Sequence, residues 1–169
     1  KKAQTPRGTS TKQKGKRNLK RAKSEGSESV VSVLVVDDQK LNRIIMIKML
    51  QKIQPLNILF EIVEASSGRA ALQLLREAVT SGKPFRLAIF DRDMGGGDMD
   101  GDVAAEIWRG EEEENGYNPL PILAWSANEN PEIQKQCLEH GMTDFMKKGI
   151  SLENFLECIQ KHILRPTLM

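Results

Sequence analysis

The stretch VVSVLVVDD, residues 30–38, decides the fold class of this chain. Its first seven residues form a nearly continuous run dominated by β-branched side chains, which is typical of a strand covered on both faces. The run stops at two aspartates. The sequence therefore predicts a buried strand that presents acidic side chains at its carboxyl end.

Strand-like and helix-like segments alternate along the rest of the chain. Short connections between them predict an α/β fold, in which a parallel sheet is wrapped by helices on both faces. The expected strands are 30–36, 55–63, 85–90, 120–126 and 143–148, the second of them behind a Pro-Asn turn. The expected helices are 40–53, 66–82, 102–114, 130–141 and 151–164.

Start and stop signals support several of these helices. Serine begins the second helix and caps the fifth, and Gly82 and Gly141 follow the second and fourth. The third helix fades into a glutamate run, 111–114, that we expect to be solvated. The expected repeating positions of the first helix are Leu41, Ile44, Ile45, Lys48, Met49 and Lys52, and the apolar positions of the last are Leu152, Phe155, Leu156 and Ile159, which we expect to divide between the core and a partner-facing edge.

Charge divides the 169 residues into a basic arm and an acidic body. Residues 1–29 carry ten Lys and Arg against two Glu, whereas residues 30–169 carry fifteen against twenty-one Asp and Glu. The arm has one large aliphatic residue, Leu19, so we expect it to be a disordered linker with residues 30–169 as the folded domain. A nuclear-import or polyanion-binding role for the arm stays an alternative. The acidic body argues against nucleic-acid binding.

The sequence predicts a cytoplasmic domain, whose parent protein could still be anchored in a membrane. No apolar run approaches the roughly 18 residues of a membrane span, and the start lacks the apolar core of a signal peptide. Cys137 and Cys158 belong to no CxxC or Cys/His metal spacing, which predicts reduced, partly buried thiols. We expect His140 and His162 to interact with helix carboxyl ends, and Trp125 to pack in the core.

Polar residues follow four of the five expected strands. Asp37 and Asp38 follow the first, Asp91 the third and Ser126 the fourth, while Lys148 ends the fifth. Because function gathers at the carboxyl ends of parallel strands, we expect these side chains to lie together.

Three carboxylates in one crevice would raise one another's pKa unless a cation neutralised them, and oxygen ligands at a water-accessible site suit Mg²⁺. Asp91 is the best candidate nucleophile because it ends a central strand, where the core fixes its position. A carboxylate can attack phosphorus to form an acyl phosphate. Lys148 and Ser126 would then bind oxygens of the transferred phosphoryl group.

The segments VLVVDD, AIFDRDM…MDG, PILAWSA and GMTDFMKKGIS resemble the signatures of the response-regulator receiver domain. The resemblance runs from about Val30 to the end of the chain. It implies a flavodoxin-like (βα)5 fold with strand order 2-1-3-4-5, in which Asp91 is phosphorylated from a phosphohistidine. It implies direct Mg²⁺ binding by Asp38 and Asp91, and binding by Asp37 mainly through water.

The resemblance also implies roles for residues around this centre. The main-chain carbonyl of Asp93 would be the third protein ligand, and Ser126 and Lys148 match the family's hydroxyl and lysine. Phe145 matches the aromatic switch that passes the change to the face of helix four, strand five and helix five. The side chains of Asp93 and Asn128 match positions that tune the lifetime of the phosphoryl group.

Two departures from the family pattern affect loops. Gly95 stands where proline is usual and two extra residues precede MDG, so we expect a longer loop, to which Asp98, Asp100 and Asp102 belong with the start of helix three. Gly149 replaces the proline that usually follows the lysine. We therefore expect a trans Lys148–Gly149 peptide, and a register slip that exchanges Lys147 for Lys148 is an alternative.

Other functions fit less well. FDRDM also resembles the D-x-D motif of haloacid-dehalogenase-like phosphatases, but there the acidic pair comes last rather than first. An EF-hand starting at Asp91 would have Gly96 and Asp102 at positions six and twelve, but it would follow a strand. A degenerate, partner-binding pseudo-receiver would be expected to lack Asp91, the acidic pair or Lys148.

We therefore expect a phosphorelay receiver that is a phosphoprotein rather than a turnover enzyme. It would catalyse its own phosphotransfer and autodephosphorylation, with a histidine kinase or a histidine-phosphotransfer protein as partner. Because the chain starts at Lys1 and stops soon after the last helix, we expect an upstream domain and no DNA-binding domain downstream. The first choice is the C-terminal receiver of a hybrid histidine kinase, and the second is a single-domain response regulator.

Overall fold

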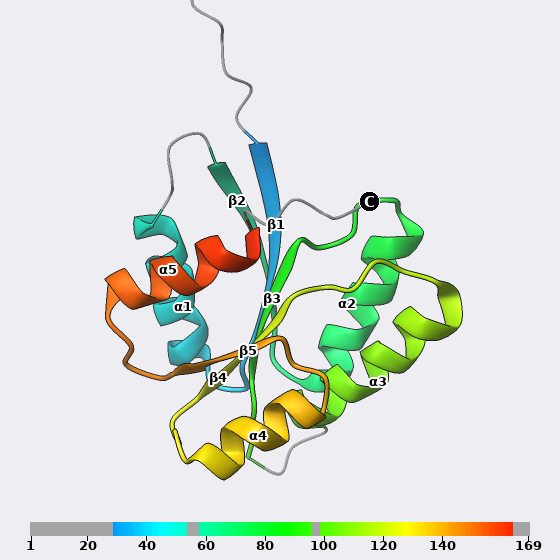
Figure 1. Ribbon diagram of the computed structural model, residues 1–169. Coiled ribbons are helices and arrows are strands. Elements are labelled where there is room, and N and C mark those ends of the chain that lie inside the picture. The colour runs from blue at the N-terminus through cyan, green and yellow to red at the C-terminus, as the bar shows by residue number, and fades with distance from the viewer. Residues whose placement is uncertain (1–28, 54–57, 96–98, 164–169) are drawn as a thin grey trace, which may run out of the picture.

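The computed structural model describes residues 29–53, 58–95 and 99–163, which form one parallel sheet with helices on both faces (Figure 1). The strand order is β2-β1-β3-β4-β5, as predicted, and every pairing is parallel. The strands are β1 (Ser29–Val36), β2 (Ile58–Ala65), β3 (Leu87–Asp91), β4 (Ile122–Ser126) and β5 (Asp144–Lys147).

Two predicted segments fall on residues that the structure does not describe. The basic arm lies outside the described residues except for Ser29, which is the first residue of β1 rather than the last of the arm. The predicted turn before β2, at Pro55 and Asn57, lies outside them as well.

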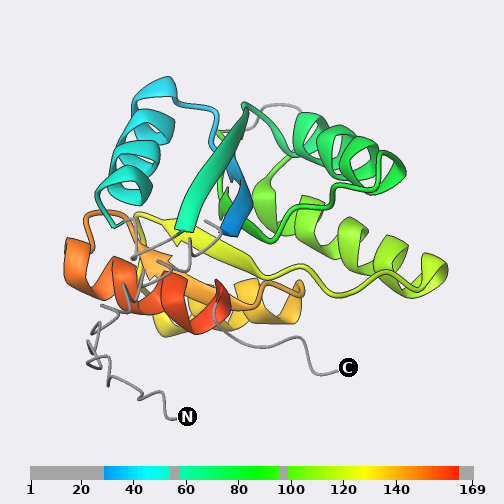
Figure 2. The same cartoon turned by 90° about the horizontal axis from the view of Figure 1, so that it is seen from above.

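Two helical layers enclose the sheet (Figure 2). One layer contains α1 (Lys40–Lys52) and α5 (Leu152–Ile163), and the other contains α2 (Gly68–Thr80), α3 (Gly101–Asn115) and α4 (Pro131–Glu139). Successive residues of β1 feed opposite cores: Val33 and Val35 pack toward α1 and α5, whereas Leu34 and Val36 pack toward α2 and α3. Among the described helices, none is both long enough and apolar enough to cross a membrane.

The predicted helix signals are present in the structure. The hydroxyl of Ser67 accepts a hydrogen bond from Ala70 N at 3.2 Å at the start of α2, and Ser151 accepts one from Asn154 N at the start of α5. Gly141 follows α4 with a φ of +85°, a conformation that favours glycine.

The first helix forms as predicted, as α1, but the repeating positions along it do not mark its buried face. Leu41 and Ile45 are 67% and 43% exposed, whereas Met46 and Leu50 are completely buried against the sheet. The helix carries aliphatic side chains around most of its circumference, so their spacing does not select one face. The direction in which α1 lies across β1 and β2 makes that selection.

The glutamate run 111–114 at the end of α3 was expected to be solvated, and this expectation is wrong for Glu112. Glu112 is 5% exposed, and its Oε1 accepts a hydrogen bond from Leu120 N at 2.7 Å. Its Oε2 pairs with the guanidinium of Arg109, which also donates to the carbonyls of Leu120 and Gly141. The pair therefore ties the end of α3 to the loops that precede β4 and β5.

We predict that Glu112→Gln lowers the free energy of unfolding by about 2–3 kcal/mol, because it leaves the partly buried Arg109 charge without its carboxylate. Urea unfolding measures the effect. The matched control is Glu113→Gln, one residue further along, where the side chain is exposed and the expected change is within about 0.5 kcal/mol. Equal effects of the two substitutions would contradict a structural role for Glu112.

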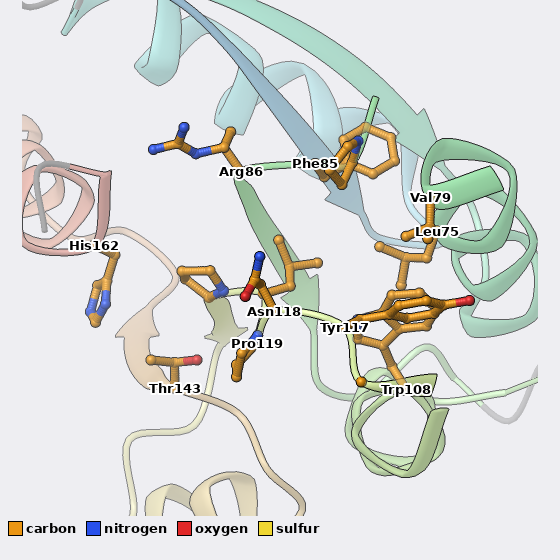
Figure 3. Close-up of a pocket in the computed structure, with 14 residues that line it drawn as sticks. Leu75, Val79, Phe85, Arg86, Trp108, Tyr117, Asn118, Pro119, Thr143 and His162 are labelled. Carbon is orange, nitrogen blue, oxygen red and sulfur yellow. The ribbon is translucent and has the colours of Figure 1, made fainter. Parts of the chain in front are cut away.

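A cavity of about 570 Å³ opens at the amino ends of β3, β4 and β5 (Figure 3). Trp108 and Tyr117 stack on one side of it, with ring centroids 6.1 Å apart, while Thr143 and His162 lie on another side. None of the predicted site residues lines this cavity. The predicted site residues lie instead at the opposite, carboxyl edge of the sheet.

Candidate functional site

The carboxyl edge of the sheet brings the predicted site residues together. Asp37 and Asp38 follow β1, Asp91 ends β3, Ser126 ends β4 and Lys148 follows β5. A cavity of about 380 Å³ opens here, lined by four of these five residues together with Asp93 and Asn128. Carboxylate oxygens of the three aspartates lie within 4.8 Å of one another.

Asp37 is buried and held from three directions. Its Oδ1 accepts hydrogen bonds from Gln39 N at 2.8 Å and from Asn42 Nδ2 at 3.1 Å. Its Oδ2 accepts one from Lys148 Nζ at 3.0 Å. Because the N-cap residue and the first turn of α1 supply one donor each, the start of the helix fixes the carboxylate of Asp37.

Asp38 differs from its neighbour because its side chain is exposed and lines the cavity. One carboxylate of the pair is therefore occupied by protein donors while the other faces the open side of the site. The direct cation contact by Asp38 and the water-mediated role of Asp37, which the family resemblance implies, stay predictions.

Asp91 is only 3% exposed and lies 2.9 Å from the ammonium of Lys148. Burial raises the pKa of Asp91 to about 7, and the negative charge of Asp37 adds to the rise, while Lys148 opposes it. The contact with Lys148 thus offsets only part of the rise in the pKa of Asp91 that burial and Asp37 cause. Without further positive charge, Asp91 would hold a proton over much of the neutral range.

Lys148 is the lysine that enters the site. Its backbone N–H donates to the carbonyl of Ser126 at 2.7 Å, which joins it to the end of β4. Lys147 points elsewhere and pairs with Glu129 at 2.7 Å, so the alternative register is excluded. The Lys148–Gly149 peptide is trans, as expected, and Gly149 makes the turn with a φ of +88°. Burial opposes the charged form of Lys148, but its contacts with Asp91 and Asp37 outweigh burial and raise its pKa.

Ser126 lines the cavity beside the acidic cluster, and Phe145 lies on the adjacent strand β5. Ser126 is 6% exposed, and its hydroxyl oxygen accepts a hydrogen bond from Asn128 N at 3.2 Å. Phe145 is partly buried and packs against the core under α2, α3 and α4. Trp125 is buried, as predicted, and meets Phe155 edge-on with ring centroids 6.1 Å apart.

The aspartates after Asp91 have separate local roles. The side chain of Asp93 is exposed, and its Oδ1 accepts a hydrogen bond from Gly95 N at 3.1 Å. Asp100 immediately precedes α3, but its carboxylate accepts from Met94 N at 2.8 Å and closes the loop instead of capping the helix. Asp102 lies in the first turn of α3, as expected, and pairs with Arg92 at 3.6 Å. Asp98 lies outside the described residues.

The residues present fit a hard divalent cation. Three carboxylates face one lysine, and the buried Oδ2 of Asp91 has no aligned hydrogen-bond donor among the described residues. Burial is the main cause of the raised pKa of Asp91, and the negative charge of Asp37 adds to it. Oxygen-only ligands beside a water-accessible cavity are the donor set that Mg²⁺ prefers.

Gly101 positions α3 against the nucleophile candidate, a role that the sequence did not reveal. Its N–H donates to the carbonyl of Arg92 at 3.0 Å, and a Cβ at this position would lie 2.0 Å from the carbonyl oxygen of Asp91. The backbones of α3 and β3 therefore meet at a distance that leaves no room for a side chain.

We predict that Gly101→Ala lowers the free energy of unfolding by about 2–3 kcal/mol, because backbone must move to admit the methyl group. Thermal or urea unfolding tests this. Gly110→Ala is the control on the same helix, where a Cβ meets no atom within 4 Å. That change is expected to stabilise by about 0.5–1 kcal/mol. Stabilisation by both substitutions would show that the contact is absent.

Two histidines have partners that the sequence prediction did not include. Both lie near helix carboxyl ends as expected, but His140 Nδ1 lies 2.9 Å from Glu106 Oε2 and His162 Nε2 lies 2.8 Å from Asp144 Oδ2. The carboxylates come from other elements, so spacing along the chain could not reveal them.

Comparisons with known proteins agree on one family. The family model for the response regulator receiver domain matches residues 33–160. The sensor histidine kinase GacS of Pseudomonas protegens is 30% identical over 146 residues, which are 84% of this chain and 15% of that protein. The two-component response regulator ARR10 of Arabidopsis thaliana is 31% identical over 133 residues, covering 79% and 21%. The chain thus spans a small part of the length of these relatives.

Solved structures agree in fold. The signal receiver domain of NarL from Mycobacterium tuberculosis has a TM-score of 0.65 and 26% identity, and the match covers 82% of this chain and 99% of that one. The receiver domain of the histidine kinase CKI1 from Arabidopsis thaliana, complexed with Mg²⁺ and BeF₃⁻, has the same score and identity, covering 80% and 91%. With its strand order, its carboxyl-edge acidic cluster and a family match over most of its length, this chain belongs to the response regulator receiver domain family.

Proposed function

We propose that this domain accepts a phosphoryl group on Asp91 from a phosphohistidine, in a Mg²⁺-dependent reaction, and relays it or uses it as a switch. The observation that carries the proposal is the position of Asp91. It is a buried carboxylate at the end of a central strand, 2.9 Å from Lys148 and within 4.8 Å of two further carboxylates.

The chain's own residues would divide the work of phosphoryl transfer. A carboxylate oxygen of Asp91 attacks phosphorus, and the P–N bond to the donor histidine breaks as the new P–O bond forms, its electron pair leaving with the imidazole. Lys148, already held between Asp37 and Asp91, moves its ammonium from the carboxylate to an oxygen of the phosphoryl group. The hydroxyl of Ser126 donates to another of these oxygens.

Asp38, Asp91 and the main-chain carbonyl of Asp93 would bind Mg²⁺, with Asp37 contributing mainly through water. When bound, Mg²⁺ neutralises charge on the aspartates and on the phosphoryl oxygens. The exposed carboxylate of Asp38 and the protein-bound carboxylate of Asp37 support this division. We further propose that the side chains of Asp93 and Asn128, which line the cavity mouth, tune the lifetime of the phosphoryl group.

The response would pass through β4 and β5. Ser126 ends β4, and Phe145 lies on the adjacent strand, paired with Ala124. Drawing the Ser126 hydroxyl toward a phosphoryl group would vacate space beside β5 and let the partly buried Phe145 turn further inward. The face formed by α4, β5 and α5 would then change shape.

Exposed apolar side chains next to the site support docking of a protein partner. Leu41 in the first turn of α1 is 67% exposed, and Leu152 in the first turn of α5 is 40% exposed. Both helices start from the carboxyl edge of the sheet and cover the same face. A histidine kinase or histidine-phosphotransfer protein that contacts these helices would present its phosphohistidine to Asp91 from the cytoplasm.

We place the domain in a hybrid histidine kinase as first choice, supported by similarity to sensor and hybrid kinases. A stand-alone response regulator is the second choice, supported by the similarity to ARR10. A kinase ATP-binding domain in the full-length gene would decide for the first.

The phosphatase and pseudo-receiver alternatives are less well supported. A phosphatase would use Asp93 as a general acid, but its side chain turns back to its own loop through the bond from Gly95 N. A pseudo-receiver would not need Asp91, Lys148 and the acidic pair to be assembled as they are. The calcium-loop alternative falls partly on residues outside the described ranges.

Incubation with Mg²⁺ and acetyl phosphate tests the proposal. Intact mass should increase by one phosphoryl group, and hydroxylamine, which cleaves acyl phosphates, should remove it. EDTA should prevent the uptake. A stable adduct that resists hydroxylamine, or uptake that is independent of Mg²⁺, would contradict the proposed chemistry.

A further inference from the structure

A second cluster of potential metal ligands lies between β5 and α5. It consists of Asp144 on β5 and of Cys158 and His162 on α5. One ligand atom from each residue lies within 4.8 Å of the others. The cluster shares no residue with the acidic site around Asp91.

The backbone places these three groups on facing surfaces. Cys158 and His162 are four residues apart on α5, so their side chains lie on the same side of the helix, one turn apart. His162 is 7% exposed and Cys158 is partly buried. Asp144 faces them from the first position of β5, and its Oδ2 lies 2.8 Å from His162 Nε2. The pattern of the sequence could not reveal the site, since Asp144 comes from a different element.

We propose that Asp144, Cys158 and His162 bind a transition-metal dication of the Zn²⁺ type and thereby pin α5 to β5. Thiolate, imidazole and carboxylate are the three ligand types that zinc uses in proteins. Four-coordinate zinc holds such atoms at about 2.0–2.3 Å, which places the ligand atoms roughly 3.4–3.7 Å apart. A spread of up to 4.8 Å therefore closes onto an ion through small side-chain movements. Water would supply the fourth ligand.

The ionic partners of Asp144 allow a dication to replace the ammonium of Lys161 at its carboxylate. Burial opposes ionisation of Asp144, but hydrogen bonds from Lys161 and His162 outweigh it and lower its pKa, so its carboxylate is charged and ready to bind a cation. Lys161 Nζ holds the same oxygen at 2.7 Å, yet its side chain is 52% exposed. The ammonium can therefore turn to solvent when a dication takes its place.

A redox role for Cys158 is less well supported. Burial, helped by the charge of Asp144, raises the pKa of Cys158 to about 11, so the metal-free thiol is protonated and a poor nucleophile. Both cysteines are free, and Cys137 is buried in the opposite core, under α4. The two lie in different cores on opposite faces of the sheet, which leaves Cys158 without a disulfide partner in the folded chain.

Titration with Co²⁺, in excess Mg²⁺ to occupy the acidic site, tests the proposal on the 169-residue chain. A thiolate-to-Co²⁺ charge-transfer band and intense tetrahedral visible bands are expected at one equivalent, and Zn²⁺ should displace both. Cys158→Ser should remove the charge-transfer band and weaken binding at least about tenfold. Asp144→Asn should weaken binding without removing that band.

Two controls keep the test specific. Cys137→Ala removes the other thiol and should leave the band unchanged. His140→Gln removes a histidine that also faces a carboxylate, Glu106, but has no thiol beside it, and should change nothing. Absence of the band in the wild type, or its persistence in Cys158→Ser, would overturn the proposal. Because Cys158 is only partly buried, that variant should fold, and circular dichroism checks this.

Discussion

Replacing Asp91 by asparagine is expected to reduce the initial rate of phosphoryl uptake at least about a thousandfold. Asparagine has nearly the same shape and keeps the strand end intact, but its amide oxygen is a very weak nucleophile. It also removes one negative charge beside Lys148, so cation binding should weaken as well. Intact mass after incubation with acetyl phosphate and Mg²⁺ measures the loss.

Asp102→Asn is the matched control for this experiment. Asp102 belongs to the same aspartate-rich stretch, but it lies in the first turn of α3 and pairs with Arg92 outside the proposed chemistry. Its replacement should leave uptake within about twofold of the wild type. Uptake by Asp91→Asn at the wild-type rate would show that another residue accepts the phosphoryl group.

Local sequence patterns are enough to predict the fold and the residues of the site. The reason is that a parallel sheet allows few arrangements of the predicted strands. A nearly continuous β-branched run such as 30–36 has few alternatives to a central strand. Once the strands are parallel, their carboxyl ends must share an edge. Asp37, Asp91 and Lys148 therefore converge whatever the detailed packing of the helices.

Features that depend on how elements pack against one another could not be predicted. Glu112 belongs to a run of four glutamates with identical local composition, and only the path of the loop to Leu120 buries it. The exposed Leu41 and the buried Met46 differ by the rotation of α1 on the sheet. The clash that a side chain at Gly101 would make with Asp91 depends on the approach of two backbones.

The stability of the metal-free domain is expected to fall as pH rises, by up to about 4 kcal/mol, because of Asp91. In the folded protein Asp91 releases its proton at about pH 7, whereas in the unfolded chain it does so near its ordinary value of 3.8. Between these values the folded state binds more protons, so raising the pH favours unfolding. A difference of about three pKa units corresponds to about 4 kcal/mol, fully lost above pH 7.

Urea unfolding of wild type and Asp91→Asn in EDTA, at a mildly acidic and a mildly alkaline pH, isolates this contribution, since titrating groups that do not contact Asp91 act equally on both proteins. The variant should gain stability relative to the wild type as pH rises. Adding Mg²⁺ at alkaline pH should restore the wild type, because a cation that binds only the folded carboxylates stabilises it by mass action. A constant difference between the two proteins at both pH values would mean that the pKa of Asp91 is not raised. Since the proposed reaction needs an ionised Asp91, the same cation that repairs the stability would also make the nucleophile available.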